Sequence, residues 1–231
     1  MTPRQVVRSF RLSLREVQEH FDTILAAVPP GPTRVSLQGV LVEQFGLELG
    51  VRWEGFIHDL FVAYLLKERR AFWGSKKTSI RQSVTDRFGD AWGRALRMAS
   101  PPRWTPRTVE ALLDPKQKNI VVTSGDHLYE RAKALLGSRA IKFSLDPEDR
   151  LLLDFAIALR NYLAHRSKAS FKELIRVVSS FTPVGLNAEL SAPMRQLTTY
   201  LRRSSGLGRY PTLPRIRVLY LRMDEIAEKL L

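Results

Sequence analysis

The chain has 231 residues and 44% of them are hydrophobic, so it can bury a substantial core and is not compositionally disordered. Its 37 lysines and arginines stand against 23 acids, and the formal net charge of +14 favours a polyanionic partner, with nucleic acid first. The absence of cysteine excludes disulfides, thiolate metal sites and a cysteine nucleophile. We expect a single globular domain over residues 1–231.

The N-terminal residues alternate charged and apolar side chains at helical spacing, whereas a signal peptide has a continuous apolar block. No run of about 18 apolar residues is present to span a membrane. The sequence therefore predicts a cytoplasmic protein with no membrane partner.

The first half of the chain has the apolar periodicity of amphipathic helices. A helix over residues 4–28 is closed by the run Pro-Pro-Gly-Pro. The longest apolar-rich segment follows over about 35–72 and is also predicted to be helical. Its glycines could kink this helix or let a neighbour approach closely; they are Gly39, Gly46, Gly50 and Gly55. A short helix is expected over 108–113.

Residues 67–107 form a basic stretch in which eleven lysines and arginines stand against three acids, a net charge of +8. Aromatic residues are interleaved with these charges: Phe72, Trp73, Phe88, Trp92 and Trp104. One interpretation is a surface that stacks bases and holds phosphates, with Lys76, Lys77 and Arg81 as RNA contacts. The other is a helix over 79–98 whose aromatic face lies in the core and whose basic face is solvated.

The second half of the chain contains several helix boundaries. Residues 118–123 have strand propensity but are too short and solitary to found a sheet. Ser124 predicts the start of a helix that Gly137 ends. Asp146 as cap, followed by Pro147 and two acids, predicts a helix that runs to about Arg166. Further helices are predicted over 171–181, 187–203 and 215–231. The predicted fold class is therefore all-α.

The helix that begins at Pro147 carries the hexapeptide Arg160-Asn161-Tyr162-Leu163-Ala164-His165. On a helical wheel its apolar residues form one stripe, which we expect in the core: Leu152, Phe155, Leu159, Tyr162 and Leu163. Arg160 and His165 border the other surface, about 140° apart, with Asn161 between them.

These three polar residues suit transesterification of the RNA backbone. An imidazole can act as general base toward a ribose 2′-hydroxyl or as general acid toward the leaving 5′-oxygen, and a guanidinium can bind the phosphate. One histidine cannot easily perform both proton transfers, so a dimer partner would supply the second.

The hexapeptide is similar to the Arg-polar-x-x-x-His signature of HEPN-domain proteins. Upstream, the string Trp53-Glu54-Gly55-Phe56-Ile57-His58-Asp59-Leu60 resembles the long helix that many HEPN proteins place before the motif helix. The resemblance covers the organisation of about residues 35–181, but only these two strings in residues. The tyrosine that one toxin group carries two residues after the histidine is absent, because Ser167 stands there. A partner that modifies that tyrosine is therefore not expected.

The resemblance implies a HEPN-like helical bundle with a core over about 35–181, on which the helix over 4–28 and the helices over 187–231 pack. Such bundles dimerise to form a composite endoribonuclease site that needs neither metal nor cofactor. Arg160 and His165 would be catalytic, with Asn161 in support. Because HEPN members include toxins and antiviral-defence proteins, an antitoxin or regulatory protein is a further expected partner besides RNA and a second copy.

Other residues complete the predicted site. Arg166 and Lys168 follow the motif and are expected to contact RNA, and Glu54 and Asp59 are candidates to line the groove. The alternative for these two acids is an ordinary polar position on a long helix. For Arg160 the alternative is a solvated position or an ion pair with Asp154.

Two other classes of protein remain open. The first is a noncatalytic bundle that binds RNA or DNA through its basic stretches. The second is an interaction or regulatory protein whose charge matches an acidic partner. The remaining histidines, His20, His58 and His127, are interpreted as structural or surface residues.

Overall fold

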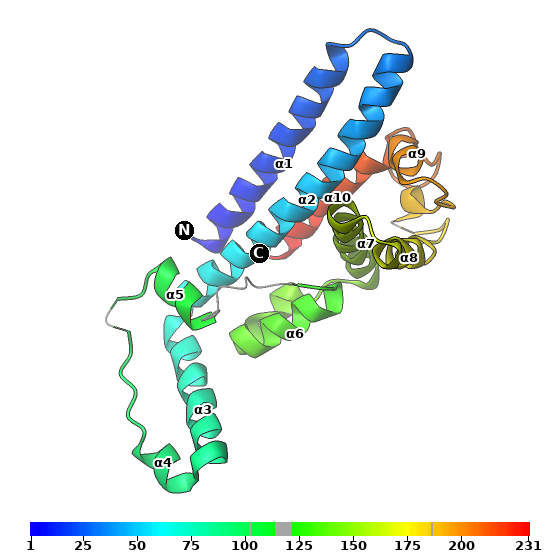
Figure 1. Ribbon diagram of the computed structural model, residues 1–231. Coiled ribbons are helices and arrows are strands. Elements are labelled where there is room, and N and C mark those ends of the chain that lie inside the picture. Colours follow the sequence, from blue (N-terminus) through cyan, green and yellow to red (C-terminus); the bar gives the residue numbers. More distant parts are fainter. Residues whose placement is uncertain (102, 114–121, 186) are drawn as a thin grey trace.

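The computed structural model describes residues 1–101, 103–113, 122–185 and 187–231 (Figure 1). Within these ranges there are ten α-helices, two 3-10 helices and no strand, which confirms the predicted all-α fold. The elements in chain order are α1 (Pro3–Ala26), α2 (Pro32–Lys67), α3 (Arg69–Phe88), α4 (Asp90–Ala95), α5 (Pro106–Leu113), α6 (Gly125–Leu136), η1 (Gly137–Phe143), α7 (Pro147–His165), α8 (Lys168–Val178), η2 (Ala188–Leu190), α9 (Leu197–Arg202) and α10 (Arg215–Lys229).

Helix α2 is the element around which the bundle is built. It has 36 residues and therefore extends for about 54 Å. Helix α1 forms an antiparallel hairpin with it, and α7, α9 and α10 pack against it from later in the chain (Figure 1). The hairpin begins with a capping box, in which Thr2 and Gln5 exchange hydrogen bonds around Pro3.

The core lies between α2 and the helices that surround it. One large cluster of buried apolar side chains joins α1, α2, α6, α7, α8, α9 and α10, with Trp53 and Phe61 at 2% and 0% exposure. A second cluster holds α3 and α5 against the end of α2; its buried members are Val62, Leu65, Phe72 and Val109. No helix within the described ranges is both long and apolar enough to cross a bilayer.

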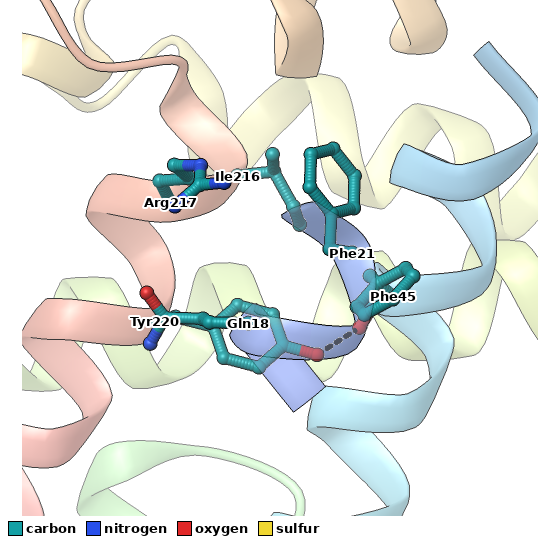
Figure 2. A pocket seen from close by; sticks show the side chains of 6 residues that line it. All are labelled: Gln18, Phe21, Phe45, Ile216, Arg217 and Tyr220. Atoms are coloured by element: carbon teal, nitrogen blue, oxygen red, sulfur yellow. Dashed lines mark hydrogen bonds between the residues drawn. The ribbon is translucent and has the colours of Figure 1, made fainter. Parts of the chain in front are cut away.

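Helix α10 is fastened to the α1–α2 hairpin by specific contacts (Figure 2). The hydroxyl of Tyr220 donates to the carbonyl oxygen of Phe45 at 2.7 Å. The Arg217 guanidinium lies 5.4 Å from the centroid of the Phe21 ring and pairs with Asp22. The gap between these helices has a volume of about 10 Å³. It can hold no more than about one water molecule, so it is no ligand site.

Helices α3 and α4 form an arm that projects from one end of the bundle (Figure 1). The predicted helix over 35–72 ends earlier, at Lys67, and the predicted helix over 79–98 is instead two helices that meet at Gly89. Gly89 has φ of +91°, a backbone conformation that favours glycine, and it turns the chain between them. The arm packs mainly on itself, because α3 contacts α4 more extensively than it contacts α2.

The start and end of α6 are as predicted. The hydroxyl of Ser124 accepts the backbone N–H of His127 at 3.0 Å, and Gly137 ends the helix with φ of +57°. The turns of η1 that follow Gly137 directly were not predicted.

The predicted helix over 187–203 is wrong, since η2 and α9 occupy only its two ends. Pro193 lies between them, and its ring and missing N–H interrupt a helix. The segment with strand propensity, residues 118–123, lies outside the described residues except for Val122 and Thr123, which are in irregular chain.

Candidate active site

Helix α7 carries the hexapeptide at its C-terminal end, and both of its ends are fixed locally. The carboxylate of Asp146 accepts the backbone N–H of Asp149 at 2.9 Å, and Pro147 takes the first helical position. The helix ends where Arg166 adopts φ of +49°, and its N–H donates to the carbonyl of Tyr162 at 2.7 Å. The hexapeptide therefore forms the last turn and a half of α7.

The predicted apolar stripe of α7 faces the core. Leu152, Phe155 and Leu159 are fully buried. Tyr162 is half-buried, and its ring packs on Phe171 of α8 with 5.0 Å between the centroids. Burial of this stripe fixes the rotation of α7 about its axis and leaves the polar residues of the hexapeptide at the border between core and solvent.

Helix α7 crosses α2 where α2 has glycine. A Cβ placed on Gly46 would lie 3.0 Å from Cδ1 of Leu163, and one placed on Gly50 would lie 2.5 Å from Cγ of Arg160. Of the two effects expected from the glycines of α2, the close approach of a neighbouring helix is confirmed at these positions. Helix α2 itself continues without a break through both of them.

Arg160 lies at this crossing with its guanidinium between the two helices. Its Nη2 donates to Oε2 of Glu54 at 3.1 Å, and its Nη1 donates to Oδ1 of Asn161 at 3.2 Å. The side chain is 27% exposed, and its Nε is buried with no hydrogen-bond partner among the described residues. The alternative ion pair with Asp154 is not formed; Oδ1 of Asp154 accepts the backbone N–H of Gly125 at 2.7 Å.

His165 is the last residue of α7 and is exposed. Among the described residues none forms a hydrogen bond or an ion pair with its ring. Arg160 is held against α2, whereas His165 lies in solvent, and no hydrogen bond joins the two within one chain. The C-terminal end of α7 therefore carries an arginine that is bonded to α2 and a histidine whose ring is exposed to solvent.

Arg166 connects the end of α7 to Glu43 of α2, and Glu43 also accepts a hydrogen bond from α9. Its Nη2 donates to Oε2 of Glu43 on α2 at 2.6 Å, and its guanidinium lies 5.4 Å from the centroid of the Tyr162 ring. Thr198 of α9 donates to the other oxygen of Glu43 at 2.8 Å. Burial alone would raise the pKa of Glu43, but the bonds from Arg166 and Thr198 outweigh it and lower that pKa. Arg166 is therefore adjacent to the motif in sequence and also stabilises the packing of α7 on α2.

The structure separates the other residues predicted for the site. Lys168 is exposed at the start of α8, directly after the motif. Asp59 lines a hollow of about 230 Å³ between α1 and α2 together with Phe10 and Arg52, and so does not share the position of Glu54. The three cations of α3 lie on the projecting arm, away from α7 (Figure 1); they are Lys76, Lys77 and Arg81.

Of two contributors to this region, Gly50 was identified in the sequence without its neighbour, and Glu43 was not identified. Gly50 carried a signal, because Gly46 and Gly50 are four residues apart and lie on one face of α2, but nothing marked α7 as the neighbour. Glu43 carried none, because its partner Arg166 is 123 residues away. No protein-family model matches the chain, and neither a curated protein nor a solved structure is detectably similar to it.

Proposed function

We propose that this protein is a metal-independent, HEPN-like endoribonuclease that acts in the cytoplasm and cleaves RNA by attack of a ribose 2′-hydroxyl on the adjacent phosphate. The observation that supports this proposal most is the Arg160 guanidinium held by Glu54 at 3.1 Å, on the same helix end as the exposed, unpaired His165. A fixed cation and a free imidazole are the groups that this reaction uses.

Each group has a distinct role in the proposed reaction. Arg160 binds the scissile phosphate and stabilises the charge that develops on its oxygens. Glu54 and Asn161 each accept one N–H of the guanidinium and so orient it, and the N–H groups that they leave free on Nη1 and Nη2 are the proposed donors to the phosphate. His165 takes the proton of the 2′-hydroxyl or gives one to the departing 5′-oxygen. The products are a 2′,3′-cyclic phosphate and a 5′-hydroxyl.

The complete site requires a second copy of the chain, because one imidazole does not serve both proton transfers at once. Ala164 and His165 are exposed at the end of α7, where a second α7 could face them. Two facing helices would bring two histidines and two arginines to one cleft. Sedimentation analysis of the purified protein tests this part of the proposal, and a monomer that cleaves RNA would remove the dimer from it.

We further propose a role as a toxin or in antiviral defence, with an acidic antitoxin or regulatory protein as the restraint. The support is the net charge of +14, which an acidic partner can cover while it blocks RNA. Arrested growth on induction of the wild type, and normal growth with His165→Ala, would agree with this role.

The direct test is cleavage of cellular RNA by purified protein, with and without a chelator. We expect Arg160→Ala and His165→Ala each to lower the cleavage rate by about 10²–10⁴. Matched controls are Arg52→Ala, which removes an arginine that pairs with Glu48 on α2, and His20→Ala, which removes an exposed histidine of α1. Both controls should cleave normally. Cleavage that survives either motif substitution, or products without cyclic phosphate, would refute the proposal.

A noncatalytic nucleic-acid-binding role is the second candidate, and the arm supports it. Phe88 and Trp92 are 61% and 67% exposed, although large aromatic side chains are usually buried, and Arg87 lies 5.6 Å from the centroid of the Phe88 ring. By contrast, Phe72 is buried and packs edge-to-face on Trp104. If RNA binds and is never cut, and His165→Ala leaves binding and biological effect intact, this candidate replaces the first.

A further inference from the structure

The N-terminal half of α1 presents a row of arginines. Arg4, Arg8, Arg11 and Arg15 recur at intervals of four, three and four residues, so they lie within an arc of about 60° on one side of the helix. The row extends for about 16 Å along the helix axis. Residues 3–15 contain no acid, and all the acids of α1 follow the row; they are Glu16, Glu19 and Asp22.

This row lines a groove that other elements complete. The groove has a volume of about 720 Å³ and is also lined by Lys142 of η1 and by Glu228 of α10. Arg11 is the cation that the fold neutralises, because it donates two hydrogen bonds to Asp224 at 2.9 Å and pairs with Glu228. The groove is thus a concave surface with positive charge on two of its sides.

The other cations of the groove have no partner within the part of the chain that the structure describes. Arg4, Arg8, Arg15 and Lys142 are exposed, and among the described residues none forms a hydrogen bond or an ion pair with their side chains. Among the described residues that line the groove, Glu228 has the one acidic side chain, and it is already paired with Arg11. The groove therefore has an unbalanced positive charge that a bound anion would compensate.

The order of charges along α1 is opposite to the one that stabilises a helix. The N-terminus of a helix favours acids and its C-terminus favours cations, but α1 has no acid in its first turn and no cation in its last turn. Arginines four residues apart on one face also repel each other. Helix stability thus does not account for this pattern, whereas the binding of an anion to the groove does.

We propose that this groove binds the phosphodiester backbone of a single strand of nucleic acid, independently of the hexapeptide of α7. A row of cations about 16 Å long follows several successive phosphates of one strand. With a volume of about 720 Å³, the groove has room for part of a single strand beside the row of arginines. No aromatic side chain lines the groove among the described residues, so binding is through the backbone and has little dependence on base sequence.

The test measures the binding of a fluorescent single-stranded oligothymidine by anisotropy at several salt concentrations. This DNA lacks the 2′-hydroxyl, so the proposed cleavage reaction cannot consume it. The test variant is Arg4→Gln/Arg8→Gln/Arg15→Gln. A control with the same change in charge is Arg131→Gln/Lys133→Gln/Arg195→Gln, which alters exposed cations elsewhere in the fold.

We expect the test variant to bind at least about tenfold more weakly, with the magnitude of the slope of log K against log salt smaller by about 2, because each phosphate contact in a single strand contributes about 0.7. The control should retain wild-type affinity. The test variant should also be at least as stable as the wild type, since the substitutions remove repulsion within α1.

Several outcomes would overturn this inference. An equal loss in both triple variants would show that net charge alone governs binding. Failure of the wild type to bind the oligonucleotide, or unchanged binding by the test variant, would exclude the groove. Adsorption to phosphatidylserine vesicles that depends on the row, without binding to the oligonucleotide, would assign the groove to a membrane surface. His165→Ala should leave binding unchanged, so this experiment fails or succeeds separately from the nuclease proposal.

Discussion

The backbone of Gly50 on α2 touches the side chain of Arg160 on α7, and there is no room for a Cβ between them: such an atom would lie 2.5 Å from Cγ of Arg160. The arginine of the hexapeptide thus lies where α7 packs closely against α2. This contact brings the guanidinium within reach of Glu54, one turn farther along α2. Arg160 is therefore both a packing contact between α2 and α7 and a residue of the candidate active site.

From the close contact between α2 and α7 at Gly50 we predict an effect on stability. We expect Gly50→Ala to lower the free energy of unfolding by about 1–3 kcal/mol, because overpacking forces the helices to shift. Gly55→Ala is the matched control on α2, since nothing lies within 4 Å of its added Cβ. Its better helix propensity should raise the free energy of unfolding by up to about 1 kcal/mol. Urea denaturation measures both, and equal effects would contradict the close approach.

The pair of Glu54 and Arg160 makes a prediction about activity. These side chains are 41% and 27% exposed, so Glu54→Gln should cost only about 0.2–1 kcal/mol of stability. Glu48→Gln is the control, because Glu48 pairs with Arg52 on the same helix at 2.7 Å with similar exposure. Both substitutions should affect urea denaturation alike, but only Glu54→Gln should slow RNA cleavage. A Glu54→Gln protein with full cleavage activity would show that Glu54 does not orient Arg160.

The arm makes a prediction about its exposed aromatic residues. Trp92→Ala should change the free energy of unfolding by no more than about 0.5 kcal/mol, because Trp92 is 67% exposed. Phe72→Ala should cost about 3–5 kcal/mol, because Phe72 is 4% exposed and packs in the second cluster. Thermal denaturation distinguishes the two. If the arm stacks bases, Trp92→Ala also weakens the binding of single-stranded RNA, and unaltered binding would rule out stacking by Trp92.

Two buried tyrosines predict loss of stability in alkali. Burial raises the pKa of Tyr200 and of Tyr220 above the ordinary value of 10.0, and their hydroxyls donate to Leu190 and Phe45. The unfolded chain loses these phenolic protons near pH 10 while the folded protein keeps them. The unfolded state then binds fewer protons, so the free energy of unfolding falls as pH rises, by up to about 1.4 kcal/mol per pH unit for each tyrosine.

Urea denaturation between neutral pH and pH above 10 measures this dependence. Tyr200→Phe should cost about 1–3 kcal/mol at neutral pH, because it leaves the carbonyl of Leu190 without its donor. It should also make the alkaline slope less steep, because it removes one of the two phenols whose pKa burial raises. Parallel slopes for the wild type and Tyr200→Phe would show that Tyr200 ionises in the folded state.

Helix boundaries were predictable where a few neighbouring residues determine them. The start of α7 follows from Asp146 and Pro147, and the end of α6 from Gly137, because caps and left-handed glycines act within one turn. The prediction of one helix over 187–203 was wrong, because it overlooked Pro193, a residue that interrupts helices and is visible in the sequence. The apolar stripe of α7 was predicted correctly, because its period sets which side is buried.

By itself the sequence determined an all-helical chain, the position of the hexapeptide at the end of α7 and the excess of positive charge. Tertiary structure alone decided that Arg160 meets Glu54, 106 residues away, and that the arginines of α1 line a groove with Lys142. The physical reason is the distance along the chain over which each kind of interaction acts. Helix periodicity and caps depend on neighbours within about one turn, whereas these contacts depend on how whole helices rotate and approach when the core packs.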